Sequence, residues 1–281
     1  MSEPCLIEEH VDPTPAGVPA VVKAVAIIRH LNAAPSTGRS LAEISGELGL
    51  TKSHCHNILK TLLASGWVVF DASRRRYTLG PRLLADISRL IGRDGRSLLI
   101  HEELVQLSLA ARVPCVLTRV DPDGSFICVD KAEEAAELLV SVPIGHRFPP
   151  DAPAQMRIRL ALATPAVCRE ALQRWQPVAR TPTTITDPER LLTEIEATRA
   201  RGYSISRGEH VIGVMSLAAP ILDQHGELQL ILQCPGVQAD IEARERAIAA
   251  LLVQTARRIS TRINGAPEPA TGGDALRCGR G

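Results

Sequence analysis

The feature that most constrains the fold is a pair of short helical segments separated by a glycine, in SLAEISGELGLTKSHCHNILKTLLASG at residues 40–66. Ser40 followed three residues later by Glu43 is the capping-box signature that begins a helix. Gly49 and Gly66 stand where the two helices are expected to end, because glycine readily adopts the left-handed conformation of a helix C-terminus. Two short helices joined by a tight glycine turn predict a helix-turn-helix.

A further helix is expected before this pair, and a β-hairpin after it. Apolar residues recur at helical spacing at positions 21, 24, 25, 28 and 31. WVVFD and RYTLG flank the turn residues ASRR, a pattern typical of a hairpin. The tip of this hairpin, or wing, carries Arg74, Arg75 and Arg76.

Three consecutive residues, His54, Cys55 and His56, raise the question of a metal site. In a helix, residues i and i+2 lie about 200° apart around the axis, so these two histidines cannot close on one ion. They could do so on a strand, but the apolar positions 55, 58, 59 and 62 repeat at helical spacing. We therefore predict that Cys55 is a small core residue, and that the chain holds no metal and no cofactor.

The opposite face of the second helix carries side chains that can hydrogen-bond to phosphates or base edges. Such a polar face is also what ordinary solvation produces, so charge decides between the two interpretations. Residues 20–96 hold 12 Lys and Arg against five Asp and Glu, a balance of +7, whereas residues 97–281 hold 20 against 22, a balance of −2. This asymmetry indicates an anionic partner for the first module. Together with the capped helix, the glycine turn and the three-arginine hairpin, it predicts that the module binds double-stranded DNA. The predicted DNA-binding residues are Lys52, Ser53, His54, His56, Asn57, Lys60, Arg74, Arg75 and Arg76.

Beyond residue 112 the predicted strands come in hairpins. Segments 114–120 and 125–131 form the first hairpin, LLVSVP at 138–143 is a third strand, and 216–222 with 227–234 form the second hairpin. Helices are expected at about 153–163, 165–175, 188–201 and 240–263. Hairpin strands with helices grouped between them predict an α+β fold with an antiparallel sheet.

Both halves resemble the IclR family of bacterial transcription regulators. SLAEISGELGLTKSHCHNILKTLLASGWVV with RYTLGPRLL is similar to the winged helix-turn-helix of that family. VPIGHRFPPDAPA, TITDPERLLTEIEATRARGYSIS and GVMSLAAPILDQHGEL resemble its effector domain, which has a GAF-like or profilin-like fold. The resemblance covers about residues 20–263. Thr51, His54 and Asn57 replace the Pro, Thr and Arg of the family pattern, so the operator sequence does not carry over.

The resemblance implies a sequence-specific, cytoplasmic, homodimeric or homotetrameric regulator that binds a pseudo-palindromic operator. It also implies a small-molecule effector between the sheet and the helix after the third strand. The residues expected to line that pocket are Asp151, Ala152, Met156, Ser216 and Gln233. Met156 stands where the family has Gly, and Ser216 where it often has Cys, so the pocket is expected to be smaller, reshaped or closed. Arg147 and Arg157 are either partners of a carboxylate effector or surface charges.

The expected organisation is a disordered arm at 1–17, the winged helix-turn-helix at 18–80, a linker helix at 81–96, the effector domain at 97–264 and a disordered tail at 265–281. The linker carries an apolar stripe that serves either an intramolecular core or, as we favour, a dimer interface. The stripe comprises Leu83, Leu84, Ile87, Leu90 and Ile91.

No enzyme motif of the GxSxG, HExxH or GxxxxGK[ST] type is present, so we predict no catalytic residues. His210 and His225 are expected to be solvated. Cys115 and Cys128, on facing strands, are expected to be buried hydrophobes or, alternatively, a redox switch. Seven dispersed cysteines and the lack of a long apolar run are typical of a cytoplasmic chain without a membrane span. Two other functions remain open: a metabolite-binding or enzymatic body with an accessory helix-turn-helix, and a regulator without an effector.

Overall fold

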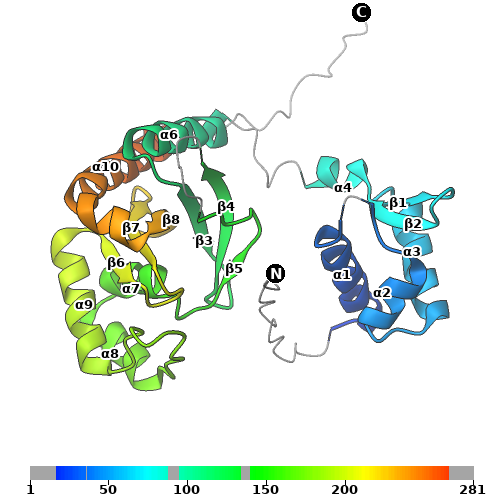
Figure 1. The fold of residues 1–281 in the computed structure, drawn as a ribbon, viewed down its shortest axis with the longest axis horizontal. Helices are drawn as coiled ribbons and strands as arrows, with labels where there is room; N and C mark the ends of the chain where they lie inside the picture. Colours follow the sequence, from blue (N-terminus) through cyan, green and yellow to red (C-terminus); the bar gives the residue numbers. More distant parts are fainter. Residues whose placement is uncertain (1–16, 36, 88–94, 134–139, 266–281) are drawn as a thin grey trace, which may run out of the picture. The chain divides into compact units, whose positions relative to one another are not determined.

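The computed structural model describes residues 17–35, 37–87, 95–133 and 140–265. It divides into two compact units, residues 1–90 and 91–281 (Figure 1). The predicted arm and tail fall almost wholly outside the described residues. None of the described helices is long and apolar enough to cross a membrane.

The first unit contains the predicted helix-turn-helix and hairpin. Its elements are α1 (Pro19–Asn32), α2 (Leu41–Glu47), α3 (Lys52–Ala64), β1 (Val68–Asp71), β2 (Arg76–Leu79) and α4 (Pro81–Asp86). Ser40 Oγ accepts a hydrogen bond from the Glu43 N–H, and the Glu43 carboxylate accepts one from the Ser40 N–H, so the predicted capping box is confirmed. Gly49 and Gly66 have positive φ angles of 63° and 74° just after α2 and α3, as predicted.

The helices of this unit enclose a small core of their own. Ile27 of α1, Ile44 of α2 and Leu59 of α3 are fully buried together with Cys55. Burial raises the pKa of the Cys55 thiol, which fits an unreactive core residue. The prediction that Cys55 belongs to the core is therefore confirmed.

The predicted linker helix is described only in part. Its first segment, α4, ends at Asp86, and residues 88–94, with Leu90 and Ile91 of the proposed apolar stripe, lie outside the described residues. The next helix, α6, spans Gly95–Ala111.

The second unit is built on a six-stranded antiparallel sheet with the order β5-β4-β3-β8-β7-β6. The strands are β3 (Cys115–Val120), β4 (Phe126–Ala132), β5 (Arg147–Phe148), β6 (Ser204–Arg207), β7 (Val214–Leu222) and β8 (Leu228–Val237). Both predicted hairpins are confirmed, as β3–β4 and β7–β8. The short polar strand β6 was not predicted.

The predicted strand at 138–143 is wrong over its described part, residues 140–143, which forms no strand. Pro143 has no N–H to donate to a sheet ladder, and the chain turns there, with the His146 N–H donating to the Pro143 carbonyl at 3.1 Å. The chain then hydrogen-bonds to Cys128 of β4 through Gly145 and His146 and pairs with β4 through the two residues of β5.

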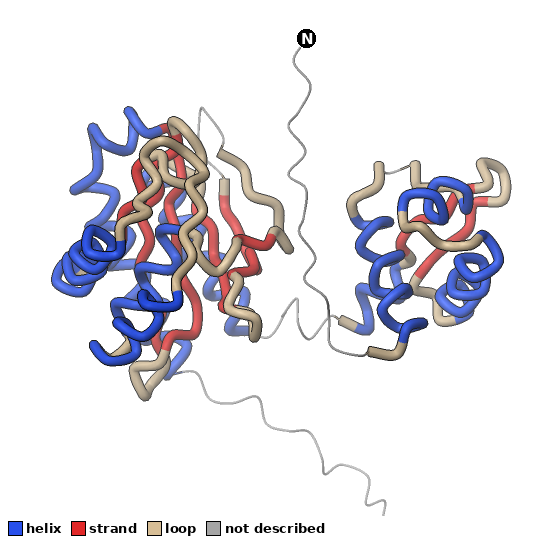
Figure 2. Tube along the Cα trace, turned by 90° about the horizontal axis from the view of Figure 1, so that it is seen from below, coloured by secondary structure: helices blue, strands red, loops and turns tan. Residues whose placement is uncertain are grey.

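Helices cover both faces of the sheet (Figure 2). On one face lie α6 and α10 (Gln238–Gly265), where Leu104 and Leu252 pack against Leu117, Leu217 and Leu232 of the strands. On the other face α7 (Pro153–Leu162) packs Ala154 and Ile158 against the strands. The helices α8 (Pro165–Arg174) and α9 (Pro188–Arg201) pack in turn against α7. The α+β class with an antiparallel sheet is confirmed.

Candidate DNA-binding surface and effector site

The outer face of α3 brings together five of the predicted DNA-binding side chains. Lys52, Ser53, His56, Asn57 and Lys60 are exposed. The opposite face of the same helix, at positions 55, 58, 59 and 62, is buried in the core, which fixes the rotation of α3 about its axis. Within the described residues, no hydrogen bond or ion pair engages these five side chains. Their donors and acceptors are therefore available to an outside partner.

His54 is placed differently from its neighbours. Its side chain is half-buried, and its Nε2 is buried with no partner among the described residues. The His54 N–H donates to the side chain of Thr51, the N-cap of α3, at 3.3 Å. His54 therefore lies at the start of the helix beside the exposed face and does not share that face.

The wing presents two of its three predicted arginines. Arg74 and Arg75 are exposed in the turn between β1 and β2, and Arg75 has a positive φ of 53°. The Asp71 carboxylate accepts hydrogen bonds from the N–H groups of Ser73 and Arg74, at 2.9 and 3.1 Å, and so holds the turn. The tip of the wing is thus a small hydrogen-bonded turn with two cationic side chains.

Arg76 was predicted at the tip, and the structure corrects this. It is the first residue of β2, and its guanidinium donates to the Gly38 carbonyl at 2.7 Å and to the Glu43 carboxylate at 3.3 and 3.4 Å. The pKa of Glu43 lies below its ordinary value, chiefly because the Ser40 N–H and hydroxyl donate to it, with Arg76 adding a smaller effect. Arg76 therefore joins the wing to the N-terminus of α2.

In the second unit, Ser216 and Gln233 lie on the face of the sheet that α7 covers. Their strand neighbours Leu217 and Leu232 point into the core under α6 and α10, and side chains alternate between the faces of a strand. Ser216 Oγ and Gln233 Nε2 are buried, and neither has a hydrogen-bond partner within the described part of the chain. Buried polar groups are seldom left without a partner, and these two atoms are exceptions on this face of the sheet.

The other predicted pocket residues divide into two groups. Ala152 precedes α7 and packs on the same face of the sheet, against Phe126, Ala218 and Ile231. The carboxylate of Asp151 is held by Arg180 through two hydrogen bonds of 2.8 Å. Met156, by contrast, packs in the cluster formed by α7, α8 and α9. The structure therefore does not group Met156 with Ser216 and Gln233, and the expectation that it narrows the pocket is not supported.

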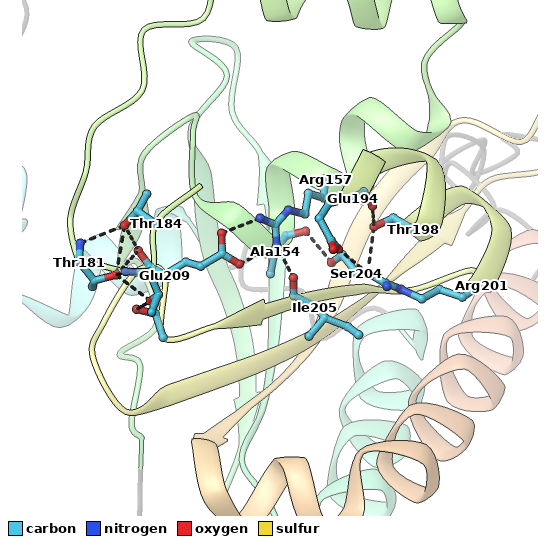
Figure 3. Close-up of polar contacts among 12 residues, drawn as sticks. Ala154, Arg157, Thr181, Thr184, Glu194, Thr198, Arg201, Ser204, Ile205 and Glu209 are labelled. Atoms are coloured by element: carbon cyan, nitrogen blue, oxygen red, sulfur yellow. Dashed lines mark hydrogen bonds and ion pairs between the residues drawn. The ribbon is translucent and has the colours of Figure 1, made fainter. Parts of the chain in front are cut away.

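Arg157 contradicts both interpretations made from the sequence. Its side chain is 2% exposed and donates two hydrogen bonds, of 2.7 and 2.6 Å, to the carboxylate of Glu209. It also donates to the Ile205 carbonyl (Figure 3). Arg157 is neither a surface charge nor a free partner for an effector, because Glu209 already neutralises it.

The same buried network fastens α7 to the strands at the edge of the sheet. The Ser204 hydroxyl donates to the Ala154 carbonyl at 2.7 Å, and the Thr184 hydroxyl donates to the Glu209 carbonyl at 2.7 Å (Figure 3). Arg147 is likewise occupied, because the Asp121 carboxylate lies 3.0 Å from its guanidinium and Asp123 pairs with it as well. Arg147, Arg157 and Arg180 thus all have carboxylate partners within the chain.

His210 was expected to be solvated, and the structure corrects this as well. It is half-buried, and its Nδ1 is buried without a partner among the described residues. Burial lowers the pKa of His210, with nearby Arg180 adding to the effect, so the imidazole is neutral at pH 7. His225 lies exposed in the β7–β8 turn, as predicted.

Cys115 and Cys128 are free and buried, but they do not lie opposite each other as expected. Cys128 lies opposite Thr118, so it does not face Cys115. The neighbour of Cys115 is Cys234 on β8, with their Sγ atoms 3.8 Å apart. The contact with Cys234, together with burial, raises the pKa of the Cys115 thiol well above its ordinary value. The prediction of buried residues is confirmed, and a redox pair of Cys115 with Cys128 is wrong.

Comparison with known proteins agrees with this arrangement. Residues 20–72 match the model of the IclR helix-turn-helix domain, and residues 99–261 match that of the bacterial transcriptional regulator IclR C-terminal domain. The HTH-type transcriptional regulator BhcR of Paracoccus denitrificans is 27% identical over 245 residues, which cover 87% of each chain. The transcriptional repressor IclR of Escherichia coli is 25% identical over 228 residues, covering 80% of this chain and 83% of its own.

Solved structures have the same fold. An IclR transcriptional regulator from Alicyclobacillus acidocaldarius matches with a TM-score of 0.75 and 27% identity, over 88% of this chain and 99% of its own. The IclR protein of Thermotoga maritima matches with a TM-score of 0.73 and 24% identity, over 86% and 98% of the two chains.

Proposed function

Because this chain belongs to the IclR family of bacterial transcriptional regulators, we propose that α3 lies in the major groove of its operator DNA. The chain is a DNA-binding regulator with a C-terminal effector-binding domain, so the remaining questions are which residues read DNA and where the effector binds. The exposed and unpartnered face of α3 carries the proposal for the DNA-binding residues.

Base reading belongs to the residues near the start of α3. The N-terminal part of a recognition helix contacts base edges, and an asparagine can donate to and accept from adenine at once. Asn57 is the exposed residue with that capacity, while Lys60 and Lys52 suit guanine or phosphate. Arg74 and Arg75 of the wing contact backbone phosphates. Arg76 is left out of this set because Glu43 and Gly38 bind it.

The operator is proposed to be pseudo-palindromic and bound by two copies of the chain. Helix-turn-helix proteins bind paired half-sites as dimers. In the first unit, α1 exposes Val21, Val22 and Val25, whose exposed fractions are 59%, 46% and 42%. Valines at i, i+1 and i+4 form an apolar stripe, and a second copy of the same stripe is the partner that we propose for it.

The effector is proposed to bind between the sheet and α7. Support comes from Ser216 Oγ and Gln233 Nε2, which are buried and unpartnered on that face. A small molecule with hydrogen-bond acceptors would satisfy the Gln233 amide and the Ser216 hydroxyl. Arg147, Arg157 and Arg180 each have a carboxylate partner. The Gln233 amide and the Ser216 hydroxyl, which are neutral, are therefore the proposed donors to the effector, whether or not it is a carboxylate.

Selection of bound sequences from a random DNA pool tests the DNA-binding proposal. We expect a consensus with two related half-sites. Asn57→Ala should then lose discrimination at one position per half-site, by about 1–3 kcal/mol, while it keeps its affinity for random DNA. An equal loss on operator and random DNA would contradict base reading by Asn57.

Thermal stability with a collection of small metabolites tests the effector site. A ligand at 100 times its Kd stabilises the folded state by about 2.7 kcal/mol. We expect the ligand that stabilises the wild type to fail with Gln233→Leu, whose operator binding should be unchanged. If the same ligand stabilises both proteins equally, the effector does not contact Gln233.

A further inference from the structure

Trp67 lies between the end of helix α3 and the start of the short helix α4. Its backbone N–H donates to the Leu62 carbonyl, in the last turn of α3, at 3.0 Å. Its carbonyl accepts from the N–H of Gly80, the N-cap of α4, at 2.8 Å. The side chain is half-buried and packs against the core of the first unit. The position of Trp67 is therefore fixed with respect to α3.

Helix α4, by contrast, has no apolar contact that holds it firmly in place. None of its six residues is buried, and none belongs to the core cluster of the first unit. An isolated helix shorter than about 12 residues is marginal in water, so its surroundings must hold it. The direction of α4 therefore depends on polar contacts at its surface.

One polar contact joins the last residue of α4 to Trp67. The indole Nε1–H of Trp67 donates to Oδ2 of Asp86 at 2.8 Å. The other carboxylate oxygen lies 3.6 Å from Nε of Arg82, one turn earlier in the same helix. That ion pair lies within α4. In the described part of the chain, the indole is thus the side-chain donor that connects α4 to the body of the first unit.

The start of α4 is held at a second point. A Cβ atom at Gly80 would clash with the carbonyl oxygen of Gly66, so the chain passes closely over the turn that ends α3. This close approach fixes where α4 begins and leaves its direction open. The bond between Trp67 and Asp86, at the other end of the helix, supplies the second point that a direction requires.

We infer that Trp67 and Asp86 are positioning residues that determine which spacing of operator half-sites the protein accepts. The inference rests on the paired operator proposed above. Helix α4 is the last described element of the first unit before the second unit begins at residue 91, so its direction is that in which the chain leaves each DNA-binding unit. With α4 fixed, the two α3 helices of a dimer keep a defined separation. With α4 loose, each unit can turn to follow a half-site that has moved.

The proposed α1 contact does not fix this separation by itself. It consists of the short stripe Val21, Val22 and Val25, whereas specific and stable interfaces bury about 1,200–2,000 Å². Two units that meet through so small a stripe can roll over each other. A further restraint on each unit is needed to set the distance between the two α3 helices, and a fixed α4 supplies it.

The test measures the affinity of full-length proteins for three kinds of DNA. These are the selected operator, the operator with one base pair inserted or removed between its half-sites, and a single half-site. One base pair moves a half-site by about 3.4 Å and turns it by about 35°. We expect a change of spacing to weaken wild-type binding about tenfold and Trp67→Phe binding about twofold. Phenylalanine keeps an aromatic ring and lacks the N–H, so affinity for the single half-site should be unchanged.

Substitutions in α4 separate positioning from a general loss of stability. Asp86→Asn keeps an oxygen that can accept from the indole and should retain the spacing preference, whereas Asp86→Leu should lose it. Arg82→Ala is the matched control, because it removes the ion pair and leaves the indole hydrogen bond, and it should behave like the wild type. A variant that merely destabilised the first unit would bind all three DNAs less tightly by the same factor.

Two results would overturn the inference. One is a spacing preference that Trp67→Phe and Asp86→Leu retain in full. The other is a loss of preference in Arg82→Ala as large as in Asp86→Leu, because the ion pair would then be responsible. A wild type that binds the operator equally well at every spacing would instead contradict the paired operator, so the failure of the inference and that of the proposed function can be told apart.

Discussion

At the scale of single residues, charged side chains in this protein fall into two groups with different roles. Arg157, Arg180 and Arg76 are bound by carboxylates of the chain and hold elements together. Arg74 and Arg75 are exposed at the wing, and Lys52 and Lys60 at α3, where they can meet DNA. Replacing a residue of the first group should lower stability, whereas replacing a residue of the second should lower the salt dependence of DNA binding.

The buried pair of Arg157 and Glu209 gives the first prediction. Arg157→Met leaves the Glu209 carboxylate buried and unpaired, so we expect a loss of about 3–5 kcal/mol in the free energy of unfolding. The double variant Arg157→Met, Glu209→Met should recover most of that loss, because no uncompensated charge remains. Urea unfolding measures both, and a loss below about 1 kcal/mol for the single variant would show that Glu209 finds water instead.

The wing gives the second prediction. Replacing Arg74 and Arg75 with Ala should lower the slope of log affinity against log salt by about 1.8, because each phosphate contact contributes about 0.9. Arg76→Ala should leave the slope unchanged and lower the stability of the first unit. Fluorescence anisotropy over a salt series checks the slopes. Equal slopes for both arginine variants and the wild type would exclude the wing from phosphate contact.

At the scale of elements, the helix termini position the DNA-binding surface. The capping box at Ser40 and the Thr51 cap begin α2 and α3, and the Arg76 bond to Glu43 ties the wing to the first of these caps. The orientation of α3 therefore depends on residues that do not themselves face DNA.

Stability of the first unit should depend on this capping box and on pH. Ser40→Ala removes the acceptor for the Glu43 N–H and should cost about 1 kcal/mol. The pKa of Glu43 is lowered in the folded state from its ordinary value of 4.5. Its ionised form therefore stabilises the fold above pH 4.5, and this stabilisation is lost as the pH falls through the lowered pKa. Thermal melts from pH 3 to 7 should show a weaker acid dependence for Glu43→Gln, and an unchanged one would contradict this.

At the scale of the whole molecule, the chain has two separate cores. Ile44 belongs to the core of the first unit and Leu252 to that of the second, and the two clusters share no residue. Each unit therefore has the apolar interior that an independently folding domain requires.

Calorimetry of two core variants should resolve this organisation. Ile44→Ala and Leu252→Ala each remove a fully buried side chain and should cost about 2–5 kcal/mol. We expect Ile44→Ala to lower the midpoint of one unfolding transition and Leu252→Ala that of another. A single transition lowered equally by both variants would mean that the units unfold as one.

Local signals were enough to predict the helix-turn-helix, both long hairpins and the exposed face of α3. The Ser40 capping box, Gly49 and the spacing of Cys55 with its neighbours act within a few residues, and so they can be recognised in the chain before it folds. The same holds for the prediction that Cys55 is a core residue.

Partners far apart in the chain were decided only by the tertiary structure. Arg157 and Glu209 are separated by 52 residues, and Cys115 and Cys234 by 119, so no local pattern connects them. Ala154 and Met156 are two residues apart on α7 and pack in different clusters, because α7 contacts the sheet on one side and α8 and α9 on the other. Helical periodicity can predict that both sides of α7 are buried, but which neighbour each side meets depends on the packing of segments that are distant in sequence.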